Sequence, residues 1–260
     1  MNPDPIETIN NYTNISVNSS IIRSQSQTES VGADLETRYF YSTDTSLSGE
    51  PYITDLISKN IVGTPLLEQY FKGTEKLVEQ KTVYGKEVTT SNLLIPKFVY
   101  SKKGTDSSTN LLEKKMTFDL YDSRGMLLQY TPENGMPVST IWGYNRTMPI
   151  AELNNVLYAN IIATVISDLQ TKSNADNDNC NLPSCKEQIL RVALNSLRNT
   201  FPNAMITTWT FDPIIGKTSV TDSKGDKLFY EYDEYNRAKA IRDKDYNILS
   251  ENQYHFSTQN

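Results

Sequence analysis

The residue types needed for nucleophilic catalysis are scarce in this sequence. A Ser-His-Asp or Cys-His arrangement needs an imidazole base, and the single histidine is His255, close to the C-terminus. It lies in the alternating segment 254–256, where a surface histidine on a strand is the simpler interpretation. Paired carboxylates can hydrolyse glycosides, and the chain has 31 acidic residues, but most of these lie at turns, where capping explains them. We therefore predict that the chain is not an enzyme.

Metal chemistry is also poorly supported by the spacing of the candidate ligands. Cys180 and Cys185 are close enough to form a small disulfide loop in an oxidising compartment, and free thiols are the alternative. A zinc site would need two further ligands, and His255 is far away in sequence. Calcium is chemically reasonable at the polar clusters 176–179 and 243–247, but neither has the spacing or the distal glutamate of an EF-hand. We predict polar loops there, and neither a metal nor another cofactor.

Binding through aromatic side chains, unlike catalysis or metal binding, is supported by the composition. The chain has 16 Tyr, 8 Phe and 2 Trp, and aromatic faces stack on sugar rings and fill protein interfaces. The first candidates for an exposed binding surface are Trp142, Tyr144, Trp209 and Tyr230. Tyrosine also suits a half-buried strand, with one edge of its ring against a core and its hydroxyl in water. This structural interpretation is the simpler one.

Charge and hydropathy argue against two classes of partner. The net charge is −6, and the longest basic runs are the dipeptides Lys102-Lys103 and Lys114-Lys115, so nothing resembles the basic stripe that a nucleic acid requires. No apolar run reaches the roughly 20 residues that span a bilayer. Residues 1–7 lack the basic and apolar regions of a signal peptide. We expect a cytoplasmic chain, or the end of a longer exported protein that is secreted or held at the cell surface.

Strand patterns and turn residues dominate the chain, so we predict a mainly β fold. A chain of 260 residues is long enough to bury a core. Residues 1–34 are rich in Asn, Ser, Thr and Gln, and form either edge strands or a partly disordered segment. Residues 35–148 are β-rich, with one short helix at 52–60. A helical hairpin is expected over 149–203, and further strands over 204–260.

The segment 149–203 differs from its surroundings because its apolar residues have helical spacing. The first i, i+4 stripe consists of Leu153, Leu157, Ile161, Val165 and Leu169. A second stripe, Ile189, Ala193 and Leu197, follows a polar loop that carries both cysteines. Two helices with such stripes are expected to pack on the adjoining sheet. A helix that binds a partner is the alternative.

The C-terminal segment repeats a strand and a turn. Aspartates recur there at intervals of 10 to 11 residues, a period typical of a meandering antiparallel sheet. An aspartate caps its own turn, and a Gly or Asn further on accepts a positive φ. The residues that we predict to shape these turns, and one similar earlier turn, are Asp122, Gly125, Asp222, Gly225, Asp233, Asn236 and Asp243.

At these turns the sequence resembles the RHS/YD-repeat family, whose units run roughly Tyr-x-Tyr-Asp-x-x-Gly-Arg-Leu. Residues 230–238, Tyr-Glu-Tyr-Asp-Glu-Tyr-Asn-Arg-Ala, match except at Asn236 and Ala238. Asn tolerates the left-handed conformation, so the turn survives, whereas Ala removes a core contact. Residues 121–125 are similar to a less complete unit. Further segments resemble the C-terminal region of large Bacteroidetes-type surface RHS proteins: 39–41, 56–60, 65–66, 93–96, 141–145, 149–151 and 207–218.

The resemblance implies a piece of a long β-sheet that spirals into a hollow shell, which in some members encloses a toxin. The implied function is that of a non-catalytic structural segment, whose partner is the remainder of the shell or a second copy joined through sheet edges. The alternative is an extracellular module that binds glycan or protein through exposed aromatic residues. Some members cut themselves near an Asp-Pro-x-Gly motif. Residues 212–216, Asp-Pro-Ile-Ile-Gly, have a different spacing, and we interpret them as a turn between strands.

Overall fold

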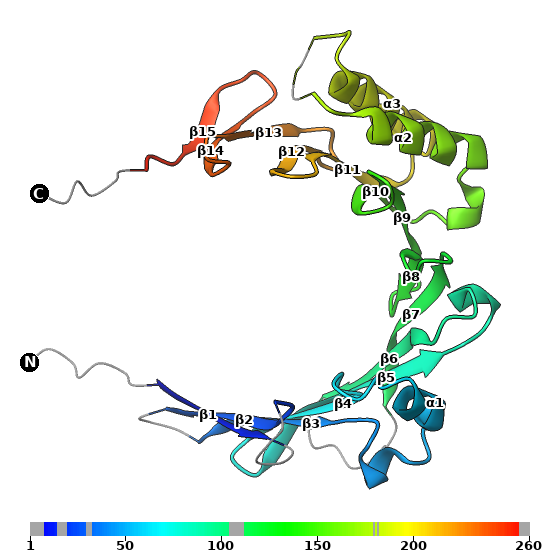
Figure 1. The fold of residues 1–260 in the computed structure, drawn as a ribbon, viewed down its shortest axis with the longest axis vertical. Helices are drawn as coiled ribbons and strands as arrows, with labels where there is room; N and C mark the ends of the chain where they lie inside the picture. Colours follow the sequence, from blue (N-terminus) through cyan, green and yellow to red (C-terminus); the bar gives the residue numbers. More distant parts are fainter. Residues whose placement is uncertain are drawn as a thin grey trace, which may run out of the picture. The chain divides into compact units, whose positions relative to one another are not determined.

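The chain is mainly β in the computed structural model, which describes residues 8–14, 20–29, 33–103, 112–178, 180 and 182–254. Across these residues, fifteen strands form one sheet in chain order, accompanied by three α-helices (Figure 1). The predicted fold class, an antiparallel meander with a two-helix insertion, is confirmed. The chain divides into two compact units. Unit 1 comprises residues 1–125 and 131–134, and unit 2 comprises residues 126–130 and 135–260.

Unit 1 is an antiparallel meander with one short α-helix. Its elements are β1 (Thr8–Asn14), β2 (Ile22–Glu29), β3 (Leu35–Phe40), η1 (Thr45–Leu47), α1 (Ile53–Ser58), β4 (Leu67–Lys72), β5 (Glu75–Gly85), η2 (Val88–Thr90), β6 (Ile95–Lys103) and β7 (Glu113–Tyr121). The predicted helix at 52–60 is confirmed as α1, whose Leu56 packs with Leu66 and Tyr84 in a small core. In the described parts of the polar segment 1–34, β1 is an edge strand, the first of the two alternatives for that segment, whereas β2 pairs with both β1 and β3.

Unit 2 continues the meander and contains the helical hairpin. Its elements are β8 (Leu127–Pro132), β9 (Val138–Gly143), β10 (Met148–Asn154), η3 (Tyr158–Asn160), α2 (Ala163–Ala175), α3 (Lys186–Thr200), β11 (Met205–Asp212), β12 (Gly216–Thr221), β13 (Lys227–Tyr232), β14 (Ala238–Arg242) and β15 (Ile248–Glu251). The last two residues of β8 belong to unit 1. None of the helices in the described part of the chain is long and apolar enough to cross a membrane.

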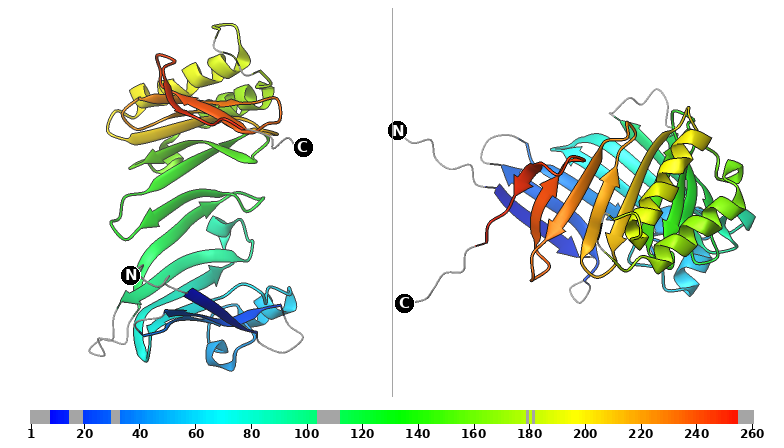
Figure 2. Two further views of the ribbon diagram at one scale, coloured as in Figure 1. Left: turned by 90° about the vertical axis from the view of Figure 1, so that its left-hand side faces the viewer. Right: turned by 90° about the horizontal axis from the view of Figure 1, so that it is seen from above.

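The helices α2 and α3 pack on one face of the sheet of unit 2 (Figure 2). Leu190, Leu194 and Leu197 recur at helical spacing along α3, and each is at most 1% exposed. They meet strand residues such as Leu153 and Ile206, both fully buried. The strand residues reach this face because alternate side chains of a strand point to the same side. The predicted packing of a helical hairpin on the adjoining sheet is therefore confirmed.

The first helix begins later than its apolar stripe predicts. Leu153 lies in β10, where it pairs with Ser139 on one side and Ile206 on the other. Leu157 and Ile161 precede α2, which contains only the end of the predicted stripe. The reason is tertiary: a ladder on both sides of β10 satisfies its backbone groups, and this outweighs a local spacing that also fits a helix.

Two further predictions concern the limits of segments. The last strand, β15, ends at Glu251, short of the predicted 256. His255 and the C-terminal residues lie outside the described part of the chain, so the prediction for the histidine stays a prediction. The predicted domain limits at residues 34, 148 and 203 also stay predictions.

Candidate functional site

The aspartates of three successive turns in unit 2, Asp222, Asp233 and Asp243, make the same hydrogen bonds. In each turn, Oδ1 accepts the amide N–H groups of the second and fourth following residues at 2.8 to 2.9 Å. The amide of each aspartate also donates to the carbonyl of the fourth residue at 2.9 to 3.0 Å. A carboxylate that accepts two amides fixes the path of its own turn. These acidic side chains are thus occupied by structural hydrogen bonds.

The third residue after each of these aspartates has a left-handed backbone. The φ angle is 93° at Gly225, 60° at Asn236 and 65° at Tyr246. A type I turn followed by a left-handed residue is a common hairpin connection, and Gly or Asn is favoured there because the conformation strains other side chains. Tyr246 is therefore an unexpected residue at this position, but its ring stacks on Phe229 with centroids 5.0 Å apart.

The earlier turn of unit 1 shares the first part of this pattern. Oδ1 of Asp122 accepts the amide N–H of Arg124 at 2.8 Å, and the amide of Gly125 donates to the carbonyl of Asp122 at 3.0 Å. Gly125 has a φ of 82°. In unit 2, Asp212 is another example, because its Oδ1 accepts the amides of the second and third following residues. The predicted turn at 212–216 is the hairpin between β11 and β12.

Tyr144 is not an exposed binding residue, and this prediction was wrong. The chain reverses directly after β9 with a φ of 48° at Tyr144, and the ring turns into the core, where the residue is 4% exposed. Its hydroxyl accepts the amide N–H of Phe211 at 2.9 Å and donates to Oδ2 of Asp176 at 2.7 Å. A buried tyrosine hydroxyl usually finds such partners. Sequence reasoning missed them because both lie on distant segments of the chain.

The other three aromatic candidates are half-buried. The indole N–H of Trp142 donates to the carbonyl of Leu127 at 2.8 Å, which gives this side chain a structural role. Trp209 lies between Thr208 and Thr210, which are buried on the helix-covered face, so strand alternation places Trp209 on the opposite face. Tyr230 has the ammonium group of Lys217 at 5.7 Å from its ring centre. Glycan or protein binding by these residues stays a prediction.

A buried ion pair that the sequence analysis did not identify lies between α3 and the sheet. Glu187 and Arg191, one helical turn apart, are 1% and 6% exposed. Nη2 of Arg191 lies 2.5 Å from Oε1 of Glu187, which also accepts the hydroxyl of Thr210 at 2.7 Å and that of Thr218. Nε of Arg191 donates to the hydroxyl of Ser219 at 3.1 Å. The signal in the sequence was a charged i, i+4 pair on the same helix face as buried leucines.

The pair is incompletely satisfied on its acidic side. Oε2 of Glu187 is buried and has no hydrogen-bond partner among the described residues. Taking a carboxylate and a guanidinium out of water costs several kcal/mol per ion, and their attraction offsets this only when both remain paired. Removal of one partner would therefore leave an uncompensated buried charge.

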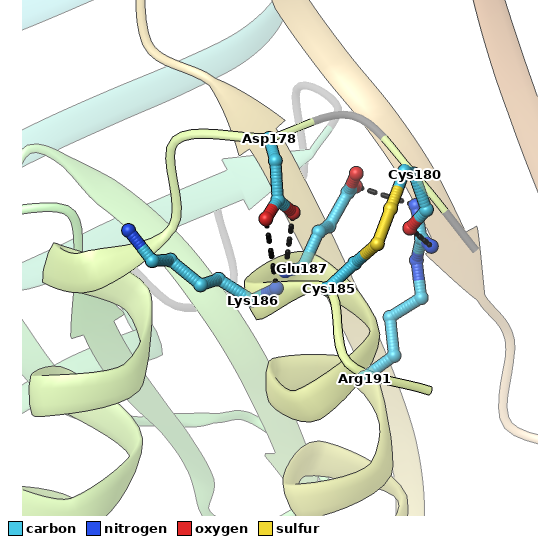
Figure 3. The surroundings of a disulfide bond; sticks show 6 residues. All are labelled: Asp178, Cys180, Cys185, Lys186, Glu187 and Arg191. Carbon is cyan, nitrogen blue, oxygen red and sulfur yellow. Dashed lines mark hydrogen bonds and ion pairs between the residues drawn. A yellow bond between two sulfur atoms is a disulfide. The ribbon is translucent and has the colours of Figure 1, made fainter. Parts of the chain in front are cut away.

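The loop before α3 is closed by a disulfide between Cys180 and Cys185, one of the two predicted alternatives (Figure 3). The two oxygens of Asp178 accept the first amides of the helix, those of Lys186 and Glu187, at 3.0 and 3.1 Å. These amides have no partner within the helix, so the carboxylate caps it. The same two hydrogen bonds lower the pKa of Asp178.

Among the described residues, the same loop contains the one group of side chains whose ligand atoms are close enough to hold a metal ion. A carboxylate oxygen of Asp178 and the sulfur atoms of Cys180 and Cys185 lie within 4.8 Å of one another. Cysteine binds zinc as a thiolate, and here both sulfurs are joined in the disulfide. Both oxygens of Asp178 are also engaged by the helix. The cluster as it stands is therefore a cap and a covalent closure of the loop.

Asp176, at the end of α2, has an unusual environment for an acid. It is 8% exposed, and burial raises its pKa to about 6, although the hydrogen bond from Tyr144 acts in the opposite direction. The charge of Glu187 raises the pKa further. Burial also raises the pKa of Tyr144, and the Asp176 carboxylate adds to the effect.

A pocket of about 340 Å³ adjoins these groups. It is lined by residues 176–178 from the loop after α2, and by residues 211–214 and Thr218 from the β11–β12 hairpin. The loop and the hairpin are held together by the Tyr144 hydroxyl, which bonds to Asp176 and to the amide of Phe211. Sequence reasoning did not identify this pocket, because its two walls are more than thirty residues apart.

No protein-family model and no curated protein matches the chain. Among solved structures, it is similar to a chain of the crystal structure of TcdB2-TccC3-TEV, with 13% identity, a TM-score of 0.40 and coverage of 84% of this chain. It is also similar to a chain of the Photorhabdus luminescens Tc holotoxin pore, with 12% identity, a TM-score of 0.35 and coverage of 89% of this chain. This chain covers 8% and 11% of those two chains. TM-scores of this size do not establish a shared fold, so a function has to be inferred from the chain's own residues.

Proposed function

We propose that this chain is a non-catalytic structural segment of a repeat β-sheet of the RHS/YD type, part of a longer surface or shell protein that is exported. The observation that carries the proposal is the threefold recurrence of one turn, at Asp222, Asp233 and Asp243, with the same hydrogen bonds each time. Each turn joins two neighbouring antiparallel strands, so one unit adds one strand to the sheet. Repeats of this kind contact mainly their neighbours and extend in one direction.

The C-terminal end of the sheet supports a role as a segment rather than a closed domain. In the described residues, β15 pairs with β14 alone, and all four of its residues are exposed. Ile248 is 50% exposed and Leu249 is 59% exposed. A strand with a free edge offers a row of amide and carbonyl groups to another strand, and these two exposed apolar side chains favour such pairing. Its natural partner is the rest of such a shell, and the isolated chain is expected to pair with a second copy.

Self-association of the purified chain tests the proposal. We expect multi-angle light scattering to show a mass above that of a monomer that rises with protein concentration. Leu249→Lys places a charge on the edge strand and is expected to shift the mass toward the monomer. Val88→Lys is the matched control, because Val88 is 83% exposed and lies outside the β-strands. A monomer at all concentrations, or equal effects of the two variants, would contradict the proposal.

A further inference from the structure

The pocket between the loop after α2 and the β11–β12 hairpin has an exposed apolar rim. Ile214 is 90% exposed, and Pro213 beside it is also exposed. Phe211 continues this surface inward and packs edge-on against the buried Tyr144, with ring centroids 5.8 Å apart. A large apolar side chain at the tip of a hairpin, above a pocket of about 340 Å³, gives an apolar ligand group a surface to contact.

The charged residues that line this pocket are all acidic. Asp176 and Asp178 contribute from one wall and Asp212 from the other, and no Lys or Arg is among the lining residues. Behind the pocket, the hydroxyl of Thr218 donates to the buried carboxylate of Glu187. Arg191 compensates that carboxylate, but its guanidinium faces the disulfide loop and Ser219. The lining therefore favours a cation.

The arrangement of the acids does not suit a bare metal ion. In the described residues, the carboxylates of Asp176, Asp178 and Asp212 do not form a group with ligand atoms within 4.8 Å of one another. Asp178 directs both oxygens to the first amides of α3, and Oδ1 of Asp212 accepts two turn amides. A divalent cation requires several convergent oxygens. Separated acids around an apolar rim suit an organic cation with a hydrocarbon part.

We propose that this pocket binds an alkylammonium group, carried by a free primary amine or by a lysine side chain. The ammonium would lie among the three aspartates, and the hydrocarbon chain would lie against Pro213 and Ile214. This site is separate from the strand edges and from the repeat turns at Asp222, Asp233 and Asp243. Its existence is therefore independent of the proposed structural function.

The test is a titration of the ¹⁵N-labelled full chain at pH 7.5 with 1-aminopentane, followed by the amide signals of Ile214, Ile215 and Thr218. We expect saturable shifts that are confined to the pocket. The neutral isostere 1-pentanol should bind about tenfold more weakly, since it lacks the charge. Calcium chloride should not shift these signals. Equal binding of the amine and the alcohol, shifts with calcium, or no shift with the amine would overturn the proposal.

Asp212→Asn removes one charge while its side-chain oxygen can still accept the turn amides. We expect about threefold to fivefold weaker binding of 1-aminopentane, the size of one ion pair near the surface. Asp222→Asn is the matched control, because Asp222 accepts two turn amides in the same way but does not line the pocket. Ile214→Ser is a second variant, expected to weaken binding without affecting the fold because the side chain is exposed. Equal affinities of the Asp212 and Asp222 variants would overturn the proposal.

The two sources of the ammonium group are separated by a second titration with Nα-acetyl-lysine methylamide. Binding at the same signals, with an affinity within about threefold of that of 1-aminopentane, would support a lysine side chain as the occupant. Binding of 1-aminopentane alone would support a free amine, because the flanking peptide groups then do not fit. Absence of binding by both probes overturns the site.

Discussion

Two regions of unit 2 use the same turns but bury their strands to different extents. The strands β9 to β12 lie under α2 and α3, and contain residues such as Ile141, Leu153 and Ile206 that are fully buried. Of the strands β13 to β15, β13 meets α3 where the guanidinium of Arg191 lies 5.1 Å from the ring centre of Phe229, and all four residues of β15 are exposed. We call these three strands uncovered, because none of them packs on a helix as closely as β9 and β11 do. The turns at Asp222 and Asp233 nevertheless have the same hydrogen bonds. Turn chemistry thus sets the path of the chain, whereas the helices supply the burial.

The ion pairs of the two regions differ in the same way. Glu187 and Arg191, on the sheet-facing side of α3, have side chains that are 1% and 4% exposed. Glu231 and Arg242, on neighbouring strands β13 and β14, have side chains that are 38% and 25% exposed. Both pairs are close, but only the second keeps much of its hydration. The contribution of a pair to stability therefore depends on which region holds it.

The largest difference between the regions is expected from breaking each ion pair. Glu187→Ala leaves the buried Arg191 without its counter-charge, and should lower the free energy of unfolding by about 3 to 5 kcal/mol. Glu231→Ala is the matched variant on the uncovered strands, and should cost less than about 1 kcal/mol. Urea unfolding at neutral pH measures both values. Similar losses in the two variants would contradict the contrast between covered and uncovered strands.

The next effect depends on pH and concerns Asp176. Its pKa in the folded chain is about 6, against an ordinary value of 3.8, so ionisation is less favourable in the folded state than in the unfolded state. The contribution of this group to stability is therefore full below pH 3.8 and is lost as the pH rises through 6. A shift of this size corresponds to about 3 kcal/mol. Asp176→Asn should be more stable than the wild type at pH 8, by up to that amount, and the gain should disappear near pH 4.

The groups that face Asp176 are Tyr144, Asp178 and Glu187, and the last two are acids that oppose its ionisation. Asp243→Asn is the control from the uncovered region. The pKa of Asp243 is lowered, first by the Asn247 side chain and then by the turn amides, so its loss should destabilise the chain at pH 8. Thermal melts of both variants from pH 4 to 8 give the signs. A gain for Asp176→Asn that is independent of pH would contradict the assigned cause.

The contrast between the regions also explains which features the sequence could predict. The turn at Asp233 depends only on residues up to Arg237, so a local pattern contains all of its hydrogen bonds. The same holds for the apolar face of α3. By contrast, the burial of Tyr144 depends on Asp176 and Phe211, which approach only after the helical hairpin packs on the sheet. The pocket has the same origin, so spacing along the chain could not reveal it.

The third effect concerns the disulfide, whose removal should affect helix α3 more than the strands β13 to β15. The paired change of Cys180→Ser and Cys185→Ser opens a short loop, and the chain-entropy model predicts a loss of about 2 kcal/mol. The loop also holds the Asp178 cap in place and receives Nη1 of Arg191 at the carbonyl of Cys180. Hydrogen exchange should therefore increase most in the first turns of α3. Equal increases in α3 and in β13 to β15 would show that the loop acts on the whole unit.

The smallest effect is expected at the turn that joins the two regions. Gly225, between β12 and β13, has a φ of 93°, and nothing lies within 4 Å of a Cβ placed there, so the cost of Gly225→Ala is conformational alone. It should be about 1 to 2 kcal/mol. Gly63→Ala is the control, because Gly63 has the same open space but no left-handed φ. Urea unfolding compares the two. A smaller loss of unfolding free energy at Gly225 than at Gly63 would mean that the left-handed conformation of this turn does not fix the pairing of β12 with β13. The strands themselves would then determine their register.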